Sequence, residues 1–109
     1  MKAQKRQRLE RAGWRVGSTK EFLGLTTEEE ALIDLKTALA QGIREERDKR
    51  KMTQQGLARI LGSSQSRVAK MEAGDPSVSI DLLVRALLRI GVNRGAVGRY
   101  VATPLRRAA

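Results

Sequence analysis

The chain lacks cysteine and histidine, and its aromatic residues are limited to one Trp, one Tyr and one Phe among 109 residues. Without Cys and His, the sequence excludes disulfides, thiol catalysis, zinc fingers, haem ligation by His and Ser-His-Asp sites. No segment approaches the ~18 consecutive apolar residues of a membrane helix, because Arg85 and Arg89 interrupt the most apolar stretch, residues 80–92. No apolar run follows the basic start, so a signal peptide is not expected. We therefore expect a cytoplasmic protein that needs no cofactor or metal and does not bind membranes.

Basic residues are abundant and unevenly placed. Lysine and arginine number 22 against 12 acidic residues, for a net charge of +10 in a chain long enough for one domain. Residues 1–20 carry a net +6, residues 21–42 a net −4 and residues 76–109 a net +5. This charge favours a polyanionic partner, most often nucleic acid. The basic ends are either solvated tails or arms that contact phosphates, and position along the chain does not decide between them.

A long amphipathic helix is predicted from Thr27 to about Lys49. Thr27 and Glu30 match a capping box, and the acids between them suit the positive end of a helix dipole. We interpret this acidic cluster as a helix start rather than a metal site. An apolar stripe at helical spacing follows, and Gly42 is expected to weaken or bend the helix midway. The stripe consists of Leu32, Leu35, Leu39 and Ile43.

Shorter helices are predicted on both sides of the long one. Before it, residues 3–12 and a segment capped by Ser18 favour short helices, with Trp14 as a packing anchor between them. After it, N-capping Ser and Thr residues and terminal glycines predict a further series of helices. The pattern fades after Asn93. The spacing of Ala96, Val97, Tyr100 and Val101 fits a helical face, but Gly95 and Gly98 weaken that prediction. The predicted caps are Thr53, Ser64 and Ser79, and the predicted stops are Gly62, Gly74 and Gly91.

The segment from Thr53 to Gly74 carries the functional signal. It predicts two short helices joined by a tight turn, and the second has a small core face and a polar exposed face. Such a helix fits the major groove of DNA, where glutamine can pair with adenine and arginine or lysine with guanine. Ser64 and the free N–H groups at both helix starts can bind phosphate oxygens. The predicted exposed face includes Gln65, Ser66, Arg67 and Lys70.

Residues 53–74 resemble the helix-turn-helix of Xre-type, lambda-repressor-like regulators, and the similarity extends over roughly residues 43–91. The resemblance implies an all-α bundle of about five helices, here with an N-terminal helical extension. Two departures are Gly56 and Ser63, where the family commonly has Glu and a branched apolar residue. Gly56 should cost the helix roughly 1 kcal/mol relative to Ala. The matching positions are Gln54, Ala58, Gly62, Val68, Glu72 and Gly74.

The resemblance also implies roles for individual residues. Gln54 would touch phosphate and brace the reading glutamine, Gln65, which would pair with adenine. Glu72 would form a structural ion pair, with Arg47 as the expected partner. The further predicted contacts to bases or backbone are Thr53, Ser64, Ser66, Arg67 and Lys70.

We therefore expect a sequence-specific regulator that acts as a repressor and binds double-stranded operator DNA as a homodimer. The expected organisation is a basic arm with short helices over residues 1–26, a DNA-binding domain over 27–92 and a basic tail over 93–109. The long helix and the Trp14-containing arm also resemble, in layout, the HigA-type antitoxins found beside RelE/HigB-like toxins. A toxin would then bind the arm or the tail, and the regulator would control its own promoter.

Two other classes remain open from the sequence. A basic RNA-binding or ribosome-associated protein fits the charge, although single-stranded RNA recognition usually employs exposed aromatics. A protein-interaction helical bundle fits the amphipathic helices but leaves Gln65, Ser66 and Arg67 unexplained. An enzyme is not expected, because the residues supply no nucleophile with a base.

Overall fold

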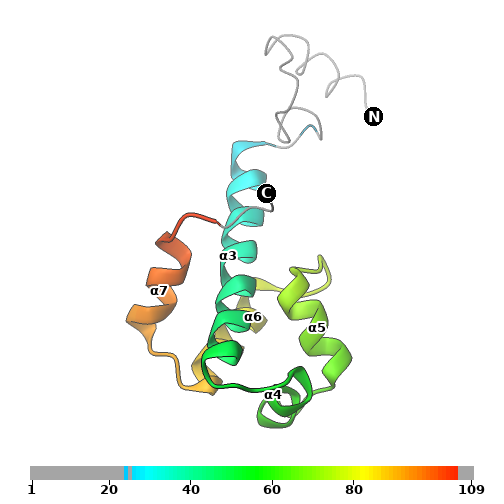
Figure 1. Cartoon of the computed structure of the whole chain (residues 1–109). Coiled ribbons are helices and arrows are strands. Elements are labelled where there is room, and N and C mark those ends of the chain that lie inside the picture. The colour runs from blue at the N-terminus through cyan, green and yellow to red at the C-terminus, as the bar shows by residue number, and fades with distance from the viewer. Residues whose placement is uncertain (1–23, 25, 106–109) are drawn as a thin grey trace. The chain divides into compact units, whose positions relative to one another are not determined.

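The computed structural model describes residue 24 and residues 26–105, and all regular structure within them is helical (Figure 1). The all-α class is thus confirmed for this part of the chain. The arm expected over residues 1–26, with its short helices and Trp14 anchor, falls outside the described residues apart from 24 and 26. None of the described helices is both long and apolar enough to cross a membrane. The helices are α3 (Thr27–Lys49), α4 (Gln54–Leu61), α5 (Gln65–Ala73), α6 (Ile80–Ile90) and α7 (Arg94–Ala102).

The capping box of α3 lies one residue before the predicted one. The Thr26 hydroxyl oxygen accepts a 3.0 Å hydrogen bond from the Glu29 amide, and a Glu29 carboxylate oxygen accepts a 3.0 Å bond from the Thr26 amide. The box is therefore formed by Thr26 and Glu29, not by Thr27 and Glu30. The predicted register was wrong because the sequence Thr-Thr-Glu-Glu-Glu offers the same spacing twice.

The later part of α3 contributes to the core, whereas the start of the predicted stripe does not. A division into two units falls between Ile33 and Asp34, within this helix. Leu39 and Ile43 are fully buried, but Leu32 and Leu35 are exposed. The 3.6-residue period correctly marks one face of the helix, but it does not show where packing on that face ends.

Helices α4, α5 and α6 begin and end where the sequence predicts. The hydroxyls of Thr53, Ser64 and Ser79 each accept a hydrogen bond from an amide three residues later, at 2.9–3.1 Å. Each helix then ends at a glycine with left-handed backbone, and Gly62, for example, has φ 64°. Glycine adopts this conformation without the steric penalty of a Cβ atom.

These helices enclose one apolar core. Leu57 of α4, Val68 of α5 and Leu83 of α6 have no exposed surface, and Ile43 of α3 joins them. Each such side chain stabilises the folded state by roughly 1.5–3 kcal/mol relative to an exposed one. The core fixes α4 and α5 against α6, so the outer faces of α4 and α5 are held in one arrangement.

The C-terminal segment, predicted as a basic tail from residue 93, contains a helix. Residues 94–102 form α7, which packs beside α6. Asn93 caps α7, since its side-chain oxygen accepts a 2.8 Å bond from the Ala96 amide. Tyr100 then packs against the core. Figure 1 shows α7 to one side of the later part of α3 and α5 to the other. Residues 106–109 of the expected tail lie outside the described residues.

Candidate nucleic-acid interface

Helices α4 and α5 form a helix-turn-helix. The turn at Gly62 is closed by a 2.8 Å hydrogen bond from the Ser63 amide to the Ala58 carbonyl. Ala58 itself is buried, and its small side chain suits the place where the two helices pack closely. The turn therefore holds α5 at a fixed angle to α4, with the first residues of α5 directed away from the core.

The faces of α5 separate sharply into core and solvent. Val68 and Met71 are buried, and they carry the packing of this helix. The residues predicted to contact DNA are exposed on the remaining surface, so they contribute little burial to the fold. The structure brings these exposed residues together along the first turns of α5: Gln65, Ser66, Arg67 and Lys70.

A chain of hydrogen bonds holds Gln65 in place. Its side-chain nitrogen donates to the Gln54 side-chain oxygen at 2.7 Å, and the Gln54 nitrogen donates to a Glu72 carboxylate oxygen at 3.2 Å. The direction of both bonds follows from Glu72, because an ionised carboxylate only accepts hydrogen bonds. One N–H and the carbonyl oxygen of the Gln65 amide therefore remain for a bidentate pair with a base.

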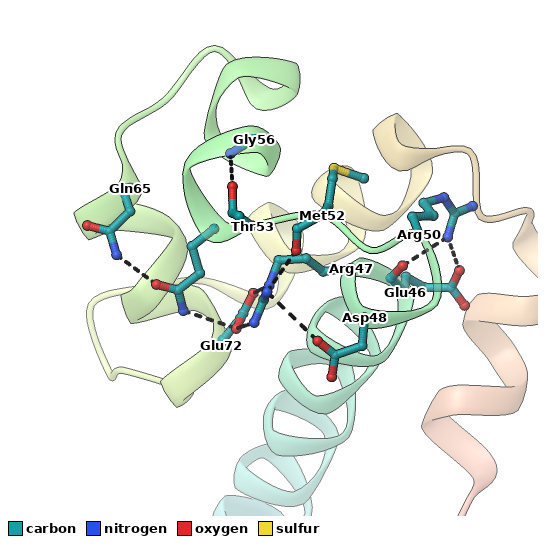
Figure 2. A network of polar contacts seen from close by, with 10 residues as sticks. Glu46, Arg47, Asp48, Arg50, Met52, Thr53, Gly56, Gln65 and Glu72 are labelled. Atoms are coloured by element: carbon teal, nitrogen blue, oxygen red, sulfur yellow. Dashed lines mark hydrogen bonds and ion pairs between the residues drawn. The ribbon is translucent and has the colours of Figure 1, made fainter.

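Glu72 is anchored in turn by Arg47 of α3 (Figure 2). The guanidinium donates to both carboxylate oxygens, at 2.7 and 3.0 Å, and also to the Met52 carbonyl at 2.9 Å. The Glu72 side chain is 5% exposed and that of Arg47 15%. The hydrogen bonds to Glu72 raise the pKa of Arg47 above its ordinary value, in spite of partial burial. The Arg47–Glu72 pair expected from the resemblance is thus present as a bidentate ion pair.

The hydroxyl groups of the capping residues Thr53 and Ser64 can still donate a hydrogen bond to a ligand. Each hydroxyl oxygen accepts a bond from its own helix, as described above, but a hydroxyl also has a proton to donate. Both side chains are exposed at the starts of α4 and α5, where helix dipoles favour anions. Their position is therefore compatible with phosphate binding at two helix N-termini.

A hollow of about 280 Å³ lies beside the exposed face of α5. Ser64, Ser66, Arg67 and Lys70 line it together with Ser77 and Val78 of the loop before α6, and no acidic residue does. The sequence predicts only a turn at residues 75–77. Asp75 shapes that turn by accepting bonds from the Ser77 amide at 2.8 Å and the Ser77 hydroxyl at 2.6 Å. The composition of this turn does not indicate that it lies beside α5.

An all-α bundle that presents the polar second helix of a helix-turn-helix is the architecture of a class of DNA-binding proteins. The helix-turn-helix family model matches residues 43–97, and the chain belongs to that family. The lambda-repressor-like fold expected from the sequence is confirmed by this match and by the helical bundle. The match also includes the first residues of α7. No curated protein and no solved structure matches the chain.

Proposed function

We propose that this chain is a sequence-specific transcriptional regulator that places α5 in the major groove and pairs Gln65 with adenine. The observation that carries the proposal is the path of hydrogen bonds from Arg47 through Glu72 and Gln54 to Gln65. A hydrogen bond between exposed side chains contributes little to folding, because water would otherwise satisfy the same groups. A base-reading glutamine gains a fixed orientation, which reduces the entropy lost when it binds.

The surroundings of Gln65 fit a role in positioning the protein on the DNA backbone. Arg67 and Lys70 supply charge, and Ser64 and Thr53 supply hydroxyl donors at helix N-termini. Contacts of this kind fix register and orientation but do not read sequence. Ser66 lies beside Gln65 and is the second candidate for a base contact.

The regulatory mechanism proposed is occupancy of a promoter by a homodimer, which acts as a repressor without any chemistry. Helix-turn-helix dimers place two recognition helices in successive major grooves, about one helical turn apart. An autoregulatory antitoxin role beside a RelE/HigB-like toxin is the narrower form of this proposal. Its test is whether a co-expressed toxin-sized protein from the neighbouring reading frame co-purifies with the chain.

Tyr100 bears on the RNA-binding alternative. Its hydroxyl donates a hydrogen bond to Glu46, and the ring packs against the core. Stacking on single-stranded bases needs an exposed ring. The Tyr100 ring is therefore unsuited to stacking on bases.

The proposal is tested by fluorescence anisotropy on the DNA upstream of the chain's own gene and on a scrambled duplex. Gln65→Ala should remove about 1–3 kcal/mol of preference for the specific duplex, and circular dichroism should show an unchanged fold. Gln55→Ala is the matched control, because Gln55 is an exposed glutamine of α4 outside the hydrogen-bonded chain. Equal losses on both duplexes for Gln65→Ala would show that Gln65 does not read bases.

A further inference from the structure

A second hollow shares Arg67 with the first. Its volume is about 270 Å³, and Arg67 lines it together with Arg85 and Arg89 of α6. Gly62 and Ser63 of the turn also line it, and no acidic residue does. Three guanidinium-bearing side chains thus border one depression, and one of them also borders the hollow beside the predicted reading residues.

The stability of α6 explains its two arginines only in part, since Arg89 lies in the last turn, where the helix dipole favours a cation. Arg85 and Arg89 are four residues apart, so they lie on one face, where like charges disfavour the helix. Arg85 forms a 3.0 Å ion pair with Asp81, but both side chains are about three-quarters exposed, at 76% and 75%. An ion pair this exposed contributes little. The core contacts of α6 come instead from Leu83, Ala86 and Leu87.

We propose that this second hollow binds a phosphate group of the DNA backbone, at the flank of the groove that α5 enters. The planar guanidinium donates paired hydrogen bonds to phosphate oxygens. The negative charge of one phosphate would also offset the repulsion among the arginines around it. Arg67 joins the two hollows into one basic surface, which assigns the phosphate to the same duplex that Gln65 would read. The inference therefore rests on the proposed function and adds Arg85 and Arg89 to the DNA-contacting residues.

The salt dependence of binding tests this site. Each phosphate contact contributes about 0.9 to the slope of log K against log salt concentration. The double variant R85Q/R89Q should reduce the slope by about 1–2 and weaken binding equally on specific and scrambled duplexes. The matched control is R94Q/R99Q, which removes the same charge from exposed positions of α7. It should change the slope by much less. Thermal unfolding of both variants checks that the fold is kept.

A neutral methylphosphonate placed at successive backbone positions locates the contact. At one linkage per half-site, the modification should weaken wild-type binding but have no further effect on R85Q/R89Q. Equal slopes for R85Q/R89Q and R94Q/R99Q, or additive losses at every linkage, would overturn the proposal. So would saturable binding of inorganic phosphate that R85Q/R89Q abolishes while its DNA slope stays unchanged.

The outcomes also separate this site from the proposed function. If the wild-type chain binds both duplexes equally, sequence-specific regulation fails, but the slope difference between the two double variants still supports the phosphate site. If the wild-type chain prefers the specific duplex and the slopes coincide, only the phosphate site fails. Absence of binding to either duplex would overturn both.

Discussion

Glu72 connects the scaffold to Gln65, the side chain that we propose reads bases. It accepts hydrogen bonds from Arg47 and from Gln54, and its side chain is almost completely buried. A buried carboxylate is tolerated only when its oxygens are satisfied, because losing the solvation of a charge is costly. The same satisfied bonds orient Gln54, and through it Gln65. The stability of the fold and the proposed geometry for DNA recognition thus depend on one side chain.

Removing Arg47 should therefore destabilise the fold strongly. Arg47→Met keeps much of the aliphatic stem but leaves Glu72 buried without a cation, at an expected cost of about 3 kcal/mol in the free energy of unfolding. Arg85→Gln is the control, because it breaks an exposed pair and should cost no more than about 1 kcal/mol. Urea denaturation measures both values. Similar small losses for the two variants would show that the Arg47–Glu72 pair does not hold the scaffold.

Helix α7 is held by a close contact with α3. A Cβ atom built on Gly42 would lie 2.9 Å from Cγ of Tyr100, so the ring rests directly on the glycine backbone. Gly42 was expected only to weaken or bend α3. Its position under Tyr100 gives it a different role, because any larger side chain there must displace the ring.

A pair of glycine substitutions tests this contact. Gly42→Ala should destabilise the fold, although alanine favours a helix by about 1 kcal/mol over glycine. Gly98→Ala, in α7, has nothing within 4 Å of the new Cβ atom and should stabilise by up to about 1 kcal/mol. Thermal unfolding and amide exchange in α7 measure the difference. The contact would be unimportant if both alanine variants were more stable than the wild type.

Glu46 forms the polar part of the same junction. Burial raises its pKa, but hydrogen bonds from Tyr100 and Arg50 and the charge of Lys49 outweigh that effect, so the pKa lies below its ordinary value. Burial and the bond to Glu46 also raise the pKa of Tyr100, which keeps the hydroxyl protonated. The junction thus depends on an ionised Glu46.

The direction of this shift predicts acid sensitivity. A carboxylate whose pKa is lowered by folding stabilises the fold above its unfolded pKa of about 4.3, and the contribution is lost as pH falls through the folded value. Glu46→Gln should lower stability at neutral pH by about 1–3 kcal/mol and flatten the loss below pH 5. Tyr100→Phe should flatten it partly. Unfolding curves from pH 3 to 7 test this, and identical acid profiles for wild type and Glu46→Gln would contradict it.

The elements differ in how far the sequence predicts them. Caps and stops of α4, α5 and α6 are local signals, so the sequence places those helices correctly. The start of α3 is ambiguous locally, and the predicted box is one residue off. Helix α7 contains Gly95 and Gly98, which weaken its local propensity, and its support comes from Tyr100 contacting residues more than 50 positions away. Such a contact leaves no periodic trace in the sequence.

The candidate site was predictable to the same degree. The spacing of Gln54, Gln65 and Glu72 follows from the family pattern, so their proximity could be expected from the resemblance. The hollow formed with Ser77 and Val78 and the one bordered by Arg85 and Arg89 depend on how α6 and the loop before it are placed by the common core. Exposed serines and arginines on separate elements carry no sequence signal that they meet.

At the scale of the whole molecule, the +10 charge and the hollow beside α5, which Arg67 and Lys70 line without an acidic residue, predict strong, salt-sensitive attraction to any duplex. Charge alone does not produce sequence preference. Sequence preference therefore depends on whether Gln65, held by its hydrogen bonds, adds selectivity to a basic surface. A homodimer would add a second reading helix and require a two-fold symmetric site.

Selection of binding sites from a pool of randomised duplexes at physiological salt tests whether the chain recognises a DNA sequence. We expect enrichment of a site with two symmetric half-sites whose centres are about one helical turn, 10–10.5 base pairs, apart. The wild-type chain should prefer that site over scrambled DNA by 10³-fold or more, and Gln65→Ala should lose the preference at an adenine position. A pool that remains random after repeated rounds, with every duplex bound equally, would contradict the account.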